Sequence, residues 1–243
     1  MAKIKTFFGV KEHKVVSEKQ WLAARKKLLV EEKKFSRLRD KLNQKRRNLP
    51  WVKIEKEYVF DGPDGQETFS DLFQGKGQLI TYHFMFGPGW GEGCAHCSFW
   101  ADHYDGTLPH LAQRDTTLVV VSRAPLSDIE GFKKRMGWDF KWVSSAKNGF
   151  NFDYHVSFTP GELRSGTAIY NYAPLDMDID EREGVSAFYK DAKGAIYHTY
   201  SSYARGIDML NTTYNFLDIT AKGRDENPER TQDWVTYRDK YTD

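Results

Sequence analysis

The first regular pattern in the chain is a stripe of large apolar residues at seven-residue intervals, formed by Trp21, Leu28, Phe35 and Leu42. The positions between them are rich in lysine and arginine, which is typical of an amphipathic helix. Ser17 followed by Gln20 is a capping-box pattern and predicts where this helix begins. The pattern ends near Pro50, so we expect an N-terminal amphipathic helical extension over residues 1–50.

This stripe needs a surface to cover it, because an isolated helix of such charge density is only marginally stable. We expect it to dock either on the main domain or on a second copy of the chain, which would make the protein a homo-oligomer through this helix. Its basic face has two interpretations, a solvated surface or a phosphate-binding surface, and we favour the solvated surface.

Two nearly continuous apolar runs, residues 79–86 and 116–122, have the character of central strands covered on both faces. Between and after them the pattern changes to helix, with one helix beginning at the cysteines near residue 94 and another over residues 127–136. A third, short strand is predicted over residues 139–143. The alternation of strand and helix predicts a parallel α/β unit.

Residues 144–183 lack periodicity and are expected to form a long insertion that helps to shape the functional site. Aromatic residues are the candidates for that role, and the alternative is that they fill an auxiliary core: Phe150, Phe152, Tyr154, Tyr170 and Tyr172. Residues 185–190 and 195–200 then form a predicted β-hairpin. We therefore expect a main domain over residues 51–220 and a C-terminal surface tail over residues 221–243.

Composition narrows the possible partners. The 243 residues are 40% hydrophobic, enough for one well-packed domain, and 36 basic against 34 acidic residues give a net charge of +2. This balance gives no overall attraction to nucleic acid or to an anionic membrane, so we expect neither as a partner. Charged residues follow Phe8 where a signal peptide would be apolar, and no apolar run reaches about 20 residues, so we expect a cytoplasmic protein.

The candidate chemistry lies in the pair Cys94 and Cys97, three positions apart after a buried strand and a glycine-rich loop. A cysteine in the first turn of a helix is close to free backbone N–H groups that favour the thiolate, and the thiolate is the nucleophile in disulfide exchange. His96 between the two cysteines would stabilise a thiolate further when protonated. Trp90 in the loop would form an apolar lip for substrate, or would simply pack into the core.

Two other interpretations of the cysteines stay open at this point. They would be inert buried residues on a helix face, or they would share a metal site with nearby histidines; the candidate ligands are Cys94, Cys97, His83, His96, His103 and His110. The chain has no second Cys-x-x-Cys and no histidine pair with zinc-finger spacing. We therefore expect no metal and no other cofactor.

Several segments together resemble a bacterial thioredoxin-like family of uncharacterised proteins that are also described as dithiol-disulfide oxidoreductases. They are residues 46–51, 83–86, 97–102, 121–126, 135–138 and 198–206. More distantly, residues 68–73 and Arg182 resemble the corresponding segments of peroxiredoxins. In that family a proline and a threonine precede the peroxidatic cysteine at fixed spacing, whereas here Pro88 lies six residues before Cys94 and no threonine intervenes. The resemblance implies a thioredoxin-like α/β fold, a central mixed sheet flanked by helices, here with an N-terminal helical extension.

The first functional hypothesis is a thiol-disulfide oxidoreductase in which Cys94 attacks and Cys97 resolves, acting on a protein or small-molecule thiol or disulfide with an external reductant. The second is a peroxiredoxin-like thiol peroxidase, in which Cys94 becomes a sulfenic acid that condenses with Cys97. The third is a non-catalytic metal-binding or adaptor protein on a thioredoxin scaffold.

Overall fold

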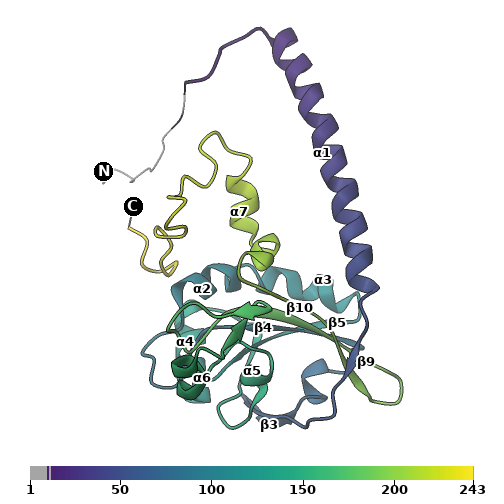
Figure 1. Ribbon diagram of the computed structural model, residues 1–243, viewed down its shortest axis with the longest axis vertical. Helices are drawn as coiled ribbons and strands as arrows, with labels where there is room; N and C mark the ends of the chain where they lie inside the picture. The colour runs from purple at the N-terminus through teal and green to yellow at the C-terminus, as the bar shows by residue number, and fades with distance from the viewer. Residues whose placement is uncertain (1–9, 11, 243) are drawn as a thin grey trace.

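The computed structural model describes residue 10 and residues 12–242, and its centre is an eight-stranded mixed sheet (Figure 1). The strand order is β1-β10-β9-β4-β5-β6-β2-β3. The bounds are β1 (Val52–Lys53), β2 (Val59–Gly62), β3 (Gly65–Thr68), β4 (Gln78–His83), β5 (Thr116–Ser122), β6 (Lys141–Ser144), β9 (Gly184–Lys190) and β10 (Ile196–Tyr203). A separate two-stranded ribbon pairs β7 (Ile169–Tyr170) with β8 (Ala173–Pro174).

The parallel unit predicted from the apolar runs is confirmed: β4, β5 and β6 run parallel in adjacent positions. On the other side of β4 lies β9, which is antiparallel to it, with His83 opposite Gly184. A Cβ added at Gly184 would lie 2.5 Å from Cδ1 of Tyr203, so only glycine fits there without a shift. The hairpin of β9 and β10 is also confirmed.

Helices cover both faces of this sheet, as expected for strands that are apolar on both sides. The α-helices after the extension are α2 (Ala95–Ala101), α3 (Leu108–Ala112), α4 (Leu126–Met136), α5 (Phe150–Asp153), α6 (Pro160–Ser165) and α7 (Thr212–Leu217). Short 3-10 helices lie at η1 (Asp71–Phe73), η2 (Asp105–Thr107) and η3 (Ala204–Leu210). The predicted central mixed sheet flanked by helices, the thioredoxin-like arrangement, is thus confirmed, together with its helical extension.

Successive side chains of β4 alternate between two cores, because neighbouring residues of a strand point to opposite faces. Tyr82 belongs to the core beneath α2 and α4, which also contains Cys97 and Phe132. Leu79 belongs to the core on the other face, which includes Phe150. The dithiol helix α2 therefore packs on one defined face of the sheet.

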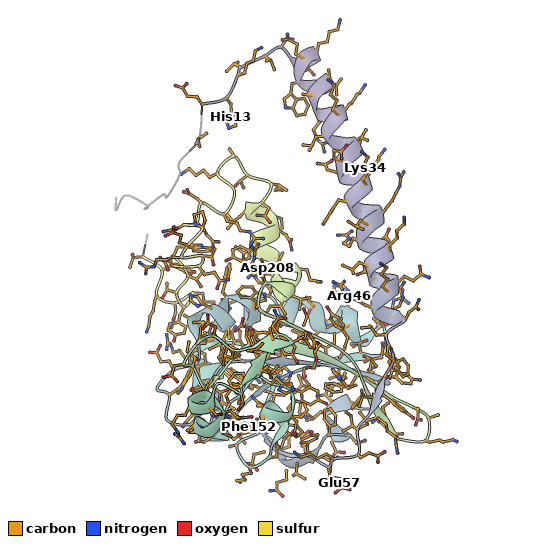
Figure 2. All side chains as sticks on the ribbon, viewed as in Figure 1. His13, Lys34, Arg46, Glu57, Phe152 and Asp208 are labelled. Atoms are coloured by element: carbon orange, nitrogen blue, oxygen red, sulfur yellow. The ribbon has the colours of Figure 1, made fainter. Side chains whose placement is uncertain are left out.

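The N-terminal helix α1 (Glu18–Arg47) begins at the predicted capping box, in which Ser17 and Gln20 bond to each other's backbone. It projects away from the sheet, and Figure 2 shows its side chains, Lys34 among them, extending freely from the helix. None of its residues is buried, and Trp21 and Phe35 are 57% and 65% exposed. The expected docking of the stripe on the chain's own domain is therefore wrong, because the chain leaves the body at Pro50 and α1 points outward.

The C-terminal segment, residues 221–242, returns to the domain instead of extending from it. Val235 is buried in the core beneath α2 and α4, and Trp234 packs edge-on against Phe99 of α2. Arg135 of α4 forms an ion pair with Asp239 at 2.8 Å. All of its described residues except Val235 are exposed or half-buried, and the segment contacts α2 and α4 near the dithiol.

No helix in the described part of the chain is both long and apolar enough to cross a membrane.

Candidate functional site

The dithiol lies where the chain leaves β4, passes through the glycine-rich loop and enters α2. The N–H of Cys94 donates a hydrogen bond to the carbonyl oxygen of Met85 at 3.0 Å, which ties the loop's end to its beginning. Gly93 is required by packing, since a Cβ there would lie 2.7 Å from the ring of Phe84. The predicted helix is confirmed: Cys94 is its N-cap and Ala101 its last residue.

The two sulfurs have different environments. Cys94 is partly exposed, whereas Cys97, one turn further on, is 2% exposed and part of the core. The backbone N–H of Met85 donates to Cys97 Sγ at 3.4 Å. Both cysteines are free thiols. The pair therefore presents one accessible sulfur with a second, protected sulfur behind it.

Their acidities differ in the same sense. The hydrogen bond from Cys97 lowers the pKa of Cys94, and backbone N–H groups of Cys97 and His96 lower it further against the opposing effect of burial. Burial raises the pKa of Cys97 well above its ordinary value, and the neighbouring charge of Cys94 adds to the shift. A thiolate in this pair thus resides on Cys94.

His96 and Trp90, the other predicted site residues, have different positions. His96 is exposed at the edge of the dithiol pocket, and its contribution to the acidity of Cys94 comes from its backbone N–H. The predicted role of its imidazole stays a prediction. Trp90 is half-buried against the core and lines a separate hollow with Phe132 and Arg135, away from the dithiol pocket. Its predicted role as a lip for substrate also stays a prediction.

The dithiol opens into a pocket of about 400 Å³. Its floor contains Cys94, Cys97, Tyr82 and Trp100, and its walls come from three segments that are remote in sequence. The lining residues of the walls are Met177, Ile179, Arg182 and Glu183 from the insertion, Ala204, Arg205, Ile207 and Asp208 from η3, and Gln232 from the C-terminal segment. Figure 2 labels Asp208 where η3 meets α7, above α2.

The insertion therefore contributes to the pocket, but not through the aromatic residues singled out from the sequence. Phe150 and Tyr154 belong to the core on the opposite face of the sheet. Tyr170 does not line the pocket but supports its wall, because its hydroxyl donates a hydrogen bond to the carbonyl oxygen of Glu183 at 2.9 Å. Sequence reasoning missed Tyr82 and Glu183 as site residues, and the only local signal for Glu183 is its place two residues before the predicted hairpin.

The candidate metal ligands are not brought together. No three of the cysteine, histidine and acidic side chains in the described residues form a group that could hold a metal ion. His83 lies on the face of the sheet opposite Cys97, where its Nε2 is 2.9 Å from Ser186 Oγ, and His103 lies 3.1 Å from Thr213 Oγ1.

Comparison with solved structures finds several proteins of low sequence identity. Peroxidoxin BcpB from Mycobacterium tuberculosis is 13% identical, with a TM-score of 0.43, covering 65% of this chain and 91% of that one. Peroxiredoxin Q from Xanthomonas campestris is 13% identical, with a TM-score of 0.45 and coverages of 68% and 91%. A protein assigned as the thiol:disulfide interchange protein DsbE of Chlorobium tepidum is 11% identical, with a TM-score of 0.42 and coverages of 69% and 95%.

No curated protein matches the chain at a significant level. A family model described as a bacterial protein of unknown function does match, and it extends from residue 10 to residue 241. The match includes α1, the dithiol, the insertion and the C-terminal segment that completes the pocket. The chain therefore belongs to the DUF899 family of bacterial proteins.

Proposed function

We propose that this protein is a dithiol-disulfide oxidoreductase in which Cys94 attacks a disulfide and Cys97 releases the product. The observation that supports it is the asymmetry of the pair: Cys94 is accessible from the pocket and has a lowered pKa, whereas Cys97 is buried and has a raised one. Disulfide exchange needs an accessible thiolate and a second thiol within reach of the mixed disulfide. We infer a cytoplasmic location, where thiol-reducing systems would supply the external reductant that the cycle needs.

The reaction has two displacement steps. In the first, the Cys94 thiolate attacks one sulfur of a disulfide R–S–S–R, a bond forms between Cys94 and that sulfur, and the other sulfur leaves as a thiolate that takes up a proton. In the second, Cys97 loses its proton and attacks Sγ of Cys94, and the remaining half leaves as a thiol. The substrate gains two electrons, the dithiol becomes a disulfide, and an external thiol reductant restores it.

Trapping the intermediate tests this proposal. Cys97→Ser should accumulate a mixed disulfide on Cys94, seen as a mass increase of one substrate half, because the resolving thiol is missing. Cys94→Ser should show no exchange, since Cys97 is buried. The variant lacking both cysteines gives the baseline. Equal labelling of Cys94 and Cys97 in the two single variants would contradict the assigned roles.

Hydrogen peroxide in place of the disulfide separates the alternatives. For an oxidoreductase, exchange with a disulfide at equal concentration should be faster than oxidation of Cys94 to a sulfenic acid. The reverse order would favour a thiol peroxidase. A dithiol that reacts with neither reagent would favour a non-catalytic scaffold.

A further inference from the structure

The walls of the dithiol pocket contain a cation that has no charged partner. Arg182 forms no ion pair with any described carboxylate; its Nη2 lies 2.7 Å from Met177 Sδ, and its guanidinium is 5.5 Å from the ring centroid of Tyr170. The other arginine of the lining differs, because Arg205 pairs with Asp208 at 3.5 Å. Arg182 is thus the guanidinium of the pocket whose charge is not already neutralised by the protein.

An unpaired carboxylate stands next to it. Glu183 accepts a hydrogen bond from the hydroxyl of Tyr170 at 3.1 Å and has no cation within ion-pair distance among the described residues. By contrast, the carboxylate of Asp208 is held by Arg224 at 3.2 Å. The negative charge of Glu183 acts against thiolate formation, since it raises the pKa of both Cys94 and Cys97. A ligand that brings a positive charge to Glu183 would remove this opposition.

Much of the remaining lining is apolar and includes sulfur, with His96 and Gln232 as its uncharged polar or titratable members. Met85, Met177, Ile179 and Ile207 surround the approach to the cysteines, with Trp100 beside them. A volume of about 400 Å³ is in the range of small-molecule sites, and walls from three segments surround the accessible sulfur. Thioether and aliphatic side chains are suitable neighbours for the sulfurs of a small disulfide.

We propose that this pocket selects small disulfides in which each half carries both a carboxylate and an ammonium group, the amino-acid and short-peptide class. The carboxylate would bind Arg182, the ammonium group would bind Glu183, and the disulfide sulfurs would lie over the apolar floor at Cys94. Guanidinium and carboxylate groups make charge-assisted hydrogen bonds that fix orientation as well as affinity. This inference rests on the proposed function, and the chemistry is the two-step exchange above, with the amino-acid thiols as products.

Four small disulfides of different charge test the selection. They are cystine, with both groups; cystamine, with ammonium groups only; dithiodipropionate, with carboxylates only; and hydroxyethyl disulfide, without charge. The reduced full-length protein is mixed with each, and the loss of its thiols is followed by mass after acid quenching. Each rate constant is divided by that of dithiothreitol with the same disulfide, which cancels the intrinsic reactivity of the reagent. Cystine should exceed hydroxyethyl disulfide roughly tenfold or more in this ratio.

Two variants test which side chain of the pocket binds the carboxylate of the disulfide and which binds its ammonium group. Arg182→Gln should reduce the advantage of dithiodipropionate and cystine over hydroxyethyl disulfide, and Glu183→Gln should reduce that of cystamine and cystine, each roughly tenfold. The matched control is Arg164→Gln, an exposed arginine on α6 outside the pocket, which should keep the wild-type ratios. The comparison of ratios remains meaningful if a variant changes the general reactivity of the dithiol.

The results distinguish a failure of the proposed substrate selection from a failure of dithiol-disulfide exchange itself. Equal ratios for all four disulfides, or a faster reaction with the disulfides of insulin than with cystine, would overturn the selection while leaving dithiol exchange intact. No reaction of Cys94 with any disulfide would overturn the proposed function itself. Loss of the cystine advantage in both pocket variants, but not in Arg164→Gln, supports the proposal.

Discussion

The phenol of Tyr237 donates a hydrogen bond to the carbonyl oxygen of Gly93 at 2.7 Å, although the two residues are 144 positions apart. Gly93 directly precedes Cys94, so this contact links the C-terminal segment to the start of the dithiol helix. The ring of Tyr237 also packs edge-on against Phe132, and the guanidinium of Arg135 lies 4.9 Å from its centroid. The position of Cys94 therefore depends on residues near the end of the chain.

Tyr237→Phe should remove this hydrogen bond and keep the ring packing. We expect the free energy of unfolding to fall by about 0.5–1.5 kcal/mol, the usual contribution of one hydrogen bond. Urea unfolding followed by tryptophan fluorescence measures the change. The matched control is Tyr189→Phe on β9, a residue that is 36% exposed and whose hydroxyl should matter little. A loss as large in the control as in Tyr237→Phe would show that the contact is not specific.

The alkylation rate of each cysteine should depend on pH in a different way. In Cys97→Ser, Cys94 should still react fast near neutral pH, because the serine hydroxyl can replace the hydrogen bond from Cys97 that lowers its pKa most and the backbone N–H groups that lower it further are retained. In Cys94→Ser, Cys97 should react slowly up to high pH, since burial keeps its pKa raised. An unperturbed thiol with a pKa of about 8.5, such as free cysteine, is the reference. Two profiles that match free cysteine would mean that the helix start does not activate the pair.

Tyr82 is expected to assist the resolving step. Its hydroxyl is buried without a hydrogen-bond partner on the pocket floor, and burial together with the neighbouring Cys97 raises its pKa well above the ordinary value. A hydroxyl there donates a hydrogen bond to Cys97 as that sulfur becomes a thiolate. Tyr82→Phe should therefore lengthen the lifetime of the mixed disulfide roughly threefold to tenfold and shift its pH profile upward.

Tyr104→Phe is the matched control for Tyr82. The hydroxyl of Tyr104 is also buried without a partner, and its ring packs edge-on against Tyr82, but it does not line the pocket. The lifetime is measured by acid quenching and mass after a single turnover. A slowing of the same size in Tyr104→Phe would show that the effect is not specific to the hydroxyl of Tyr82.

His83 should make folding sensitive to mild acid. Burial lowers the pKa of this residue from 6.5 to about 3. Below about pH 6.5 His83 is protonated in the unfolded chain, whereas in the folded chain it stays neutral down to about pH 3. The contribution of neutral His83 to the free energy of unfolding is therefore complete above about pH 6.5. It is lost as the pH falls from there toward 3, by up to about 1.4 kcal/mol per pH unit.

Urea unfolding at several pH values between 4 and 7 measures this slope. His83→Gln keeps a polar group facing Ser186 and should flatten the dependence. His110→Gln, at an exposed position on α3, should leave it as in the wild type. Parallel slopes in all three proteins would exclude His83 as the source.

The stripe on α1 should hold two copies of the chain together. Large side chains that lie exposed on the helix gain roughly 1.5–3 kcal/mol each when a second surface buries them fully. Phe35→Asp should therefore reduce the molecular mass measured by light scattering after gel filtration. Lys34→Asp changes the charge on a neighbouring exposed position and should retain the larger species. A monomeric wild type at all concentrations would refute this interface.

Local sequence patterns predicted the helices and strands that are specified by residues close together in the sequence. The apolar runs predicted β4 and β5, and the capping box at Ser17 predicted the start of α1. The pocket was not predictable in the same way, because Glu183 reaches Cys94 only through the pairing of β9 with β4. The local pattern of residues 144–183 does not indicate which of them this pairing brings into the pocket.

The expectation that α1 docks on the chain's own domain failed for a related reason. A seven-residue stripe reports that one face of a helix is suited to burial, and it carries no information on whether the covering surface belongs to the same molecule. The candidate chemistry was easier, since both sulfurs and the start of their helix lie within four residues. The position of the two sulfurs at the helix start was therefore predicted better than the walls that surround them.

The close approach of Gly184 to the ring of Tyr203 offers a way to sort relatives without solving their structures. The hydroxyl of Tyr203 donates a hydrogen bond to the carbonyl oxygen of Tyr154 at 3.0 Å, which holds the ring in its position. A side chain at position 184 would displace β9 or the ring, and Glu183 with it. Genomes should thus hold two classes of Cys-x-x-Cys homologue, and only those with glycine at this position should share the ligand preference of this chain.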